Sequence, residues 1–224
     1  MDPRRAVERA VITHAHSDHA RRGSTTYLCA DPCKPLLHAR LGDVAIESVP
    51  FGRATEVNGV RVSFHPAGHI LGSAQIRIEH GGKVWVVTGD YKTDTDPSCE
   101  AFELVRCDTF ITECTFGLPI YRWPDPEQVF GEINAWWRTN RARGRASILF
   151  GYSLGKAQRL LCGVDPSIGP IYTAPSVEAM TEVYRRAGIS LPAGCGFPSG
   201  DDSEAWTAGS SCPITSTGRS YWMW

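Results

Sequence analysis

Six consecutive residues near the start of the chain carry four side chains that can bind a metal ion, in His14-Ala15-His16-Ser17-Asp18-His19. Imidazole nitrogens and carboxylate oxygens are ligands that Zn²⁺ accepts, at roughly 2.0–2.2 Å. The segment follows an expected strand over 7–13, and on a loop that curls at a strand end alternate side chains can face two different ions. Ser17 or Asp18 could instead cap a following helix, but a helix cap gives no reason for three histidines.

Two later segments offer further ligands. His69 lies among small residues in Pro66-Ala67-Gly68-His69-Ile70-Leu71-Gly72-Ser73-Ala74, as a closely packed ligand loop requires. A histidine satisfied in the core is the alternative. Asp90 follows Thr88-Gly89 at the end of an expected strand, where one carboxylate can bridge two ions; the alternative is a turn aspartate next to glycine.

Two ions about 3.5–4 Å apart would share a water, lower its pKa and clamp the attacked and leaving oxygens. This chemistry predicts a metal-dependent hydrolase. It suits phosphodiesters, β-lactams and thioesters equally, so the metal site alone does not choose the substrate.

The elements that must position these ligands are mostly short strands up to about residue 115. Alternating apolar residues predict one hairpin over 57–64, with its turn at Asn58-Gly59, and a second over 74–88, with its turn at Gly81-Gly82. Another brief strand is expected over 109–112.

The pattern changes after Phe116. Helices are expected over 126–141, 154–162 and 176–187, and strands over 146–150 and 170–173. Alternating helices and strands are typical of an α/β unit. From 193 to 224 neither the helical nor the strand period is present.

The pattern HxHxDH, then a His, then an Asp, resembles the metallo-β-lactamase superfamily. The resemblance implies that the first zinc is held by His14, His16 and His69, the second by Asp18 and His19, with Asp90 bridging the two. It also implies that Asp18 handles protons. In the family an acidic residue at the end of the first strand steadies the metal loop, and Asp2 is the candidate here; a plain N-terminal aspartate is the alternative.

Two further motifs resemble the β-CASP branch, whose members cleave nucleic acids. Thr112-Glu113-Cys114-Thr115-Phe116-Gly117 is similar to the acidic motif that opens the β-CASP insertion, with Glu113 as the acid and Cys114 as a departure. The alternative is a surface glutamate. Gly151-Tyr152-Ser153-Leu154-Gly155-Lys156-Ala157 departs from a nucleotide-binding P-loop, but Lys156 at a helix start could hold one backbone phosphate; simple capping is the alternative.

Between residue 2 and about residue 191 the chain resembles the ligase-associated DNA-damage-response exonucleases. The phrases that carry this resemblance are Val11-Ile12-Thr13-His14-Ala15-His16-Ser17-Asp18-His19-Ala20-Arg21, Gly117-Leu118-Pro119-Ile120-Tyr121-Arg122-Trp123 and Ile133-Asn134-Ala135-Trp136-Trp137. The resemblance implies a nucleic-acid substrate, DNA rather than RNA, and as partners an ATP-dependent DNA ligase and a helicase.

The expected fold class is therefore α/β (α+β): an αββα metallo-β-lactamase sandwich over 1–117 and a partial β-CASP insertion over 118–192. Family members have a strand pair ahead of the position of Asp2 and two histidine motifs near the C-terminus, and the sequence contains no histidine after His80. We therefore expect the second zinc site to be incomplete and the chain to have little activity.

Composition fits a globular protein, since 42% of the 224 residues are hydrophobic and 21% are charged. No stretch approaches the roughly 20 apolar residues of a membrane helix, and no signal peptide is evident, so we expect a cytoplasmic protein without membrane contact. The eight scattered cysteines predict thiols rather than a disulfide framework. The rival hypotheses are a small-molecule hydrolase of the lactamase or thioesterase type and an inactive zinc-binding remnant.

We predict that the aberrant segment 193–224 is translated out of frame from about Asp201, after a deletion near 194–200. Ser211-Cys212-Pro213-Ile214-Thr215 can be encoded as TCC-TGT-CCG-ATC-ACG, and the shifted frame then reads Leu-Ser-Asp-His. That reading supplies the SDH-type motif that the family has at this end. Sequencing the locus tests the prediction, which fails if the codons for 211–214 cannot spell Ser-Asp-His in the shifted frame.

Overall fold

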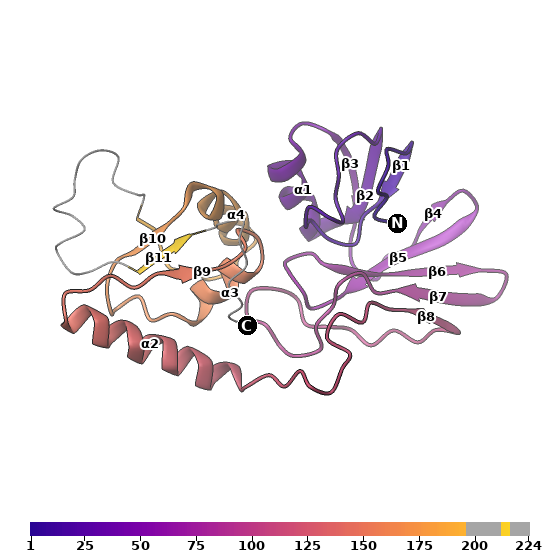
Figure 1. Ribbon diagram of the computed structural model, residues 1–224. Helices are drawn as coiled ribbons and strands as arrows, with labels where there is room; N and C mark the ends of the chain where they lie inside the picture. The colour runs from indigo at the N-terminus through magenta and orange to yellow at the C-terminus, as the bar shows by residue number, and fades with distance from the viewer. Residues whose placement is uncertain (196–211, 216–224) are drawn as a thin grey trace. The chain divides into compact units, whose positions relative to one another are not determined.

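The computed structural model describes residues 1–195 and 212–215. The chain divides into two units, Met1–Thr115 and Phe116–Trp224 (Figure 1). The sequence placed a boundary after residue 117.

Unit 1 contains two β-sheets. The first is parallel, in the order β1-β2-β3, and consists of β1 (Arg9–Val11), β2 (Thr26–Ala30) and β3 (Ala45–Val49). The second runs in chain order and consists of β4 (Thr55–Val57), β5 (Val60–Pro66), β6 (Ala74–His80), β7 (Lys83–Val87) and β8 (Thr109–Ile111). Its strands are antiparallel except that β8 runs parallel to β7.

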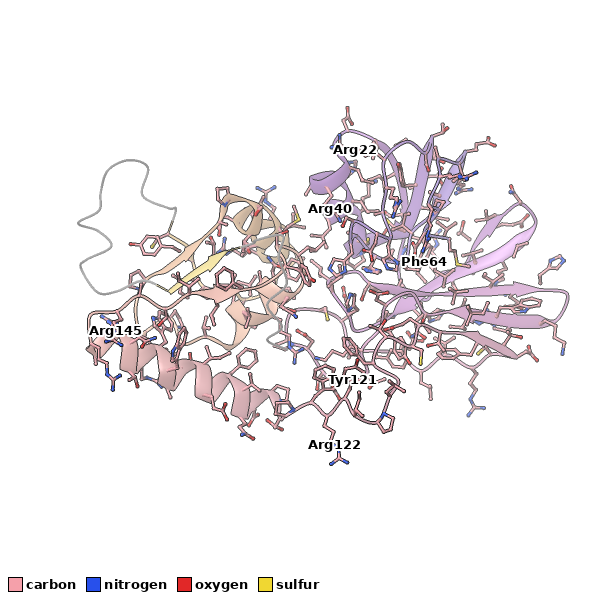
Figure 2. The ribbon with its side chains drawn as sticks, viewed as in Figure 1. Arg22, Arg40, Phe64, Tyr121, Arg122 and Arg145 are labelled. Carbon is pink, nitrogen blue, oxygen red and sulfur yellow. The ribbon has the colours of Figure 1, made fainter. Side chains whose placement is uncertain are left out.

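The two sheets of unit 1 share one apolar core. Leu28 and Ala30 of β2 pack with side chains of β5 and β6, among them Phe64, which has no exposed surface (Figure 2). The short 3-10 helix η1 (Asp31–Cys33) and helix α1 (Lys34–Leu41) link the parallel strands β2 and β3. The α+β class expected from the sequence is confirmed.

Both predicted hairpins are confirmed, and their turns explain why the sequence indicated them. Asn58 and Gly59 have φ angles of 51° and 77°, the left-handed values that a two-residue turn of this kind requires. Positive φ angles also occur at Gly81 and Gly82 between β6 and β7. Residues 26–49 form β2, η1, α1 and β3, although the sequence indicated no element there. Sequence analysis missed them because a short buried apolar run has no periodicity that identifies it as strand or helix.

Unit 2 is an α/β unit, as predicted. Its elements are α2 (Pro126–Ala142), β9 (Leu149–Phe150), α3 (Lys156–Gly163), β10 (Ile171–Thr173), α4 (Pro175–Arg186) and β11 (Cys212–Thr215). The three strands form a parallel sheet in the order β10-β11-β9. Helix α2 begins after Asp125, whose carboxylate accepts hydrogen bonds from the backbone N–H groups of Glu127 and Gln128.

Strand β11 differs from the sequence prediction, which expected no regular element beyond residue 192. The rest of the segment predicted to be out of frame, 196–211 and 216–224, lies outside the described residues. Within the described part of the chain, every helix is too short or too polar to cross a membrane.

Adjacent tryptophans on α2 provide a test of the core of unit 2. Trp137 is 1% exposed and packs against Leu149, Leu161 and Ile171, whereas Trp136 is 42% exposed. We predict that Trp137→Ala lowers the free energy of unfolding by about 3–5 kcal/mol, and that Trp136→Ala changes it by less than about 1 kcal/mol. Urea denaturation followed by circular dichroism measures both; equal losses would contradict the assignment of Trp137 to the core.

Candidate metal centre

Four predicted ligands from three separate segments converge on one point in unit 1. The ligand atoms of His14, His16, His69 and Asp90 all lie within 4.8 Å of one another. His16 Nδ1 lies 3.1 Å from His14 Nε2 and 3.2 Å from His69 Nε2. Asp90 Oδ2 lies 3.7 Å from each of the same two Nε2 atoms.

These separations fit a four-coordinate metal ion. Ligands at 2.0–2.2 Å in a tetrahedron are about 3.3–3.6 Å apart, and the four distances above lie on either side of that range. A single proton on His16 Nδ1 can form only one good hydrogen bond, so it cannot satisfy His14 and His69 together. A metal ion at the centre would bind all four ligand atoms, three imidazole nitrogens and one carboxylate oxygen, at once.

A hydrogen-bond chain from Asp2 orients the first histidine. The hydroxyl of Thr13 donates to Asp2 Oδ2 at 2.6 Å, so its oxygen accepts from His14 Nδ1, which lies 3.0 Å away. The lone pair of His14 Nε2 is therefore left facing the other ligands, the usual arrangement of a metal-bound imidazole. His14 itself is completely buried.

The loop that carries His69 is held by close packing. The backbone N–H groups of His69 and Ile70 both donate to the hydroxyl of the buried Ser73. Gly72 has a φ of +70°, and a Cβ atom there would lie 2.2 Å from the backbone nitrogen of Cys33. The close packing expected around His69 is present, and glycine is the residue that permits it.

Asp90 follows β7 and faces two groups of ligands. Its Oδ2 atom lies near His14 and His69, and its Oδ1 atom lies 3.2 Å from His19 Nε2. The turn before it depends on Gly89, where φ is +57° and a Cβ atom would lie 2.6 Å from Cβ of Thr13.

Asp18 and His19 lie next to the Oδ1 side of this cluster, with His19 in contact with both Asp90 and Asp18. His19 Nε2 is 3.6 Å from Asp18 Oδ2, and its Nδ1 is 3.0 Å from Asp2 Oδ2. The structure thus brings the predicted ligands of a second ion together through Asp18, His19 and the Oδ1 atom of Asp90. The side chain of Asp18 is 72% exposed.

Two of the imidazoles in the cluster are held in the neutral form. Burial, and then the neighbouring His16, lower the pKa of His69 to about 4. Burial, followed by the neighbouring His16, also lowers the pKa of His14 well below its usual value. Both imidazoles are therefore neutral near pH 7 and can act as ligands without losing a proton.

His19 is in the opposite state. Burial acts to lower its pKa, but hydrogen bonds with Asp2 and Asp90 outweigh burial and raise the pKa to about 10. The hydrogen bond with His19 in turn lowers the pKa of Asp90. An imidazolium between two carboxylates occupies the position where the resemblance places the second ion, so a cation there would compete with a proton.

Glu113 and Lys156 lie in different units. The Glu113 carboxylate accepts the Thr115 N–H at 2.9 Å and lies near enough to His69 to act against the lowering of its pKa. Lys156 begins α3, and its Nζ atom lies 5.7 Å from the centre of the Tyr152 ring. Burial lowers the pKa of Lys156, and Arg159 adds to this.

Sequence reasoning missed several residues that support the ligands. Arg40 of α1 donates a hydrogen bond to the carbonyl of Ala15, the residue between His14 and His16 (Figure 2). Glu100 accepts the N–H of Gly72 at 2.9 Å. Thr13 and Ser73 occur within the motifs quoted from the sequence, but the sequence assigned them no role of their own. No spacing rule links Arg40 or Glu100 to the ligands, because the fold alone brings them together.

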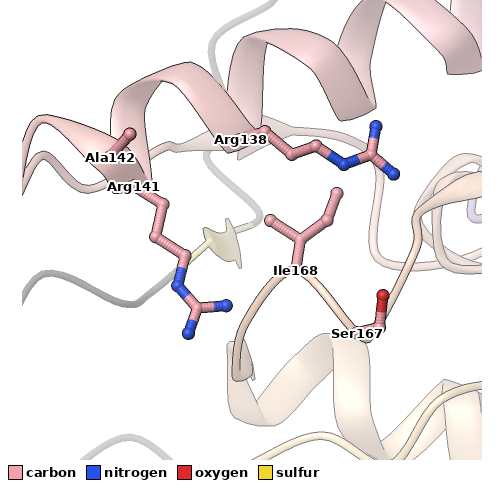
Figure 3. A pocket seen from close by; sticks show the side chains of 5 residues that line it. All are labelled: Arg138, Arg141, Ala142, Ser167 and Ile168. Atoms are coloured by element: carbon pink, nitrogen blue, oxygen red, sulfur yellow. The ribbon is translucent and has the colours of Figure 1, made fainter.

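Unit 2 contains an open hollow of about 470 Å³ between α2 and the loop after α3 (Figure 3). It is lined by Arg138, Arg141, Ala142, Ser167 and Ile168. Arg138 is paired with Asp165 at 2.7 Å. None of the lining residues is a metal ligand, so the hollow does not form a second metal centre.

Comparison with known proteins gives relatives that are named as enzymes of nucleic acids. A protein of Opitutus terrae named "Probable DNA ligase" is 38% identical over 196 residues, which cover 86% of this chain and 19% of that protein. "Endoribonuclease ysh-1" of Neurospora crassa is 30% identical and covers 59% of this chain and 17% of its own length. "Cleavage and polyadenylation specificity factor subunit 3-I" of Arabidopsis thaliana is 28% identical, over 65% of this chain and 22% of that protein. No protein-family model matches the chain.

The chain spans about a fifth of the length of these relatives. A crystal structure of a protein of unknown function from Enterococcus faecalis V583 has the same fold, with a TM-score of 0.60 at 13% identity over 95% of this chain and 59% of that one. The relatives, the shared fold and the converging His and Asp ligands agree on one assignment. The chain is a homologue of these enzymes of nucleic acids, in keeping with the resemblance of its motifs to the β-CASP branch of the metallo-β-lactamase superfamily.

Proposed function

We propose that the chain belongs to a zinc-dependent phosphodiesterase that cleaves nucleic acid, DNA rather than RNA. The observation that carries the proposal is the convergence of the ligand atoms of His14, His16, His69 and Asp90 to within 4.8 Å of one another. Three imidazoles and one carboxylate suit zinc better than magnesium or calcium, which prefer oxygen ligands. The higher identity to the Opitutus protein than to the two eukaryotic ones favours DNA.

In this proposal each residue near the centre has a definite task. When bound, zinc supplies a Lewis acid that lowers the pKa of a water toward ~7 and neutralises charge on a phosphate. The first ion would be held by His14, His16 and His69, the second by Asp18 and His19, and Asp90 would be shared between them. Asp2 fixes Thr13 and His19 in place.

Proton transfer falls to Asp18. Its carboxylate is exposed to solvent beside His19, so it can accept a proton from the attacking water and release it to bulk solvent. Glu113, close to His69, would support that ligand electrostatically. Lys156 at the start of α3 would contact a phosphate of the substrate backbone.

We further propose a role in DNA repair, alongside an ATP-dependent DNA ligase and a helicase. The similarity to a protein named as a DNA ligase supports the first partner. The helicase is suggested by the family resemblance of the motifs alone.

The proposed metal site leads to a prediction about zinc content. Four ligand atoms lie close enough to share one ion, whereas the second position offers three candidate ligands, with Asp18 and Asp90 each close to His19, so we expect nearer one zinc than two per chain by elemental analysis after gel filtration. His16→Ala should lose most of the bound zinc, and the exposed His80→Ala should keep it. Two tightly held ions per chain would contradict the incomplete second site.

The second prediction concerns activity. Replacing a residue that merely orients a ligand costs about 10–100-fold, so Asp90→Ala or His16→Ala should lower metal-dependent cleavage of single-stranded DNA and bis-p-nitrophenyl phosphate by about 100-fold or more. His80→Ala serves as the matched control. We expect low activity from these 224 residues, and more when the shifted reading frame after residue 200 is restored. Turnover of nitrocefin or a glutathione thioester instead would favour a small-molecule hydrolase.

A further inference from the structure

Three aromatic side chains at the start of unit 2 form a group that the proposed reaction does not use. The aromatic cluster consists of Phe116, Tyr121 and Trp123. The ring of Phe116 meets those of Tyr121 and Trp123 edge-on, with centroids 5.2 and 5.1 Å apart. The rings of Tyr121 and Trp123 are nearly parallel, at 15°, with centroids 6.2 Å apart.

The aromatic cluster lies at the surface. Phe116, Tyr121 and Trp123 are 48%, 42% and 50% exposed. Phe110, Trp136, Phe150 and Tyr152 are exposed to a similar or greater degree, so the distinguishing feature of the aromatic cluster is that its three rings contact one another. None of the three cluster residues belongs to the buried core of unit 2 described above. Exposed aromatic groups of this kind mark surfaces that bind something.

The segment is held in shape before any ligand arrives. The prolines at positions 119 and 124 each fix one φ angle on either side of Tyr121. The N–H of Tyr121 donates to the carbonyl of Leu118 at 3.1 Å, which closes a turn. A surface that is already ordered loses little conformational entropy on binding.

Charge and ring geometry favour a nucleic-acid strand as the occupant. Arg122, between Tyr121 and Trp123 in the sequence, extends from the same segment (Figure 2) and forms no ion pair with a described residue. Proteins that bind single strands combine aromatic rings, on which bases stack, with cations that follow the phosphates. Leu118 and Ile120 are exposed as well, so an apolar protein surface is the competing occupant.

We propose that the aromatic cluster and Arg122 hold unpaired bases of a single strand of nucleic acid. The rings stack on bases, and the Arg122 guanidinium contacts a phosphate. The inference rests on the proposed function and deepens it, because it specifies that the nucleic acid is single-stranded where it contacts this surface. Base stacking tolerates any sequence, so binding here does not depend on base identity.

Binding of a fluorescein-labelled 15-nucleotide dT strand tests the proposal. Fluorescence anisotropy is measured with zinc-loaded protein and a phosphorothioate dT strand that resists cleavage, for the wild type and for Tyr121→Ala, Trp123→Ala, Trp123→Phe and Arg122→Ala. The matched control is Trp136→Ala, an exposed tryptophan of the same unit outside the aromatic cluster.

Each aromatic-to-alanine change should raise the Kd for dT by about 5- to 150-fold. Trp123→Phe keeps a stacking ring and should stay within a few-fold of the wild type, which separates loss of stacking from misfolding. Arg122→Ala should reduce the slope of log affinity against log salt by about 0.7.

Equal affinity of Tyr121→Ala, Trp123→Ala and Trp136→Ala would overturn the proposal. So would a wild-type chain that does not bind dT, or one that self-associates through the aromatic cluster in sedimentation. Zinc content measured by elemental analysis reports on the metal centre separately. Absence of bound zinc, with dT binding intact and dependent on the aromatic cluster, would count against the proposed function and not against this surface.

Discussion

The carboxylate of Asp2 accepts hydrogen bonds from the backbone N–H and the hydroxyl of Thr13 and pairs with His19. Through these contacts it sets the tautomer of His14 and the direction of His19, two imidazoles whose ring centroids lie 4.1 Å apart next to Asp90. The backbone N–H of Asp2 is itself held by the carbonyl of Val11 in β1. The ligand geometry therefore depends on one carboxylate tied to the first strand, and the rest of unit 1 keeps that strand in register.

The ligand loops all begin where strands end, which is why a mixed sheet fold suits this site. The β1 strand leads into the first loop, β5 leads toward His69, and β7 leads to Asp90. Rigid strands on a shared apolar core bring side chains together to within a few tenths of an ångström, which loops alone do not achieve. Arg40 and Glu100 add restraints from outside the strands, by holding the backbone next to the ligands.

The convergence of His14, His16, His69 and Asp90 on one candidate metal centre was predictable from the sequence, because histidine and aspartate at such short spacing have few other uses. Both hairpins were predictable because Asn58-Gly59 and Gly81-Gly82 carry the turn conformation in their own residue types. Residues 26–49 were not, since the buried strand β2 has no alternation to reveal it. The supports from Thr13, Ser73, Arg40 and Glu100 could not be found either, because they depend on contacts between residues far apart in the chain.

The wide spacing of the ligands along the chain has a consequence for folding. An ion held between the first loop, His69 and Asp90 would act as a cross-link that closes two long chain segments, and it would bind the folded chain far better than the unfolded one. Folding and metal capture would then be thermodynamically coupled. Protonation of His19 affects the same equilibrium. A second cation beside Asp90 would compete with the proton on His19, whose pKa is about 10. The supply of free metal and the pH of the surroundings would together set how much of the protein is folded.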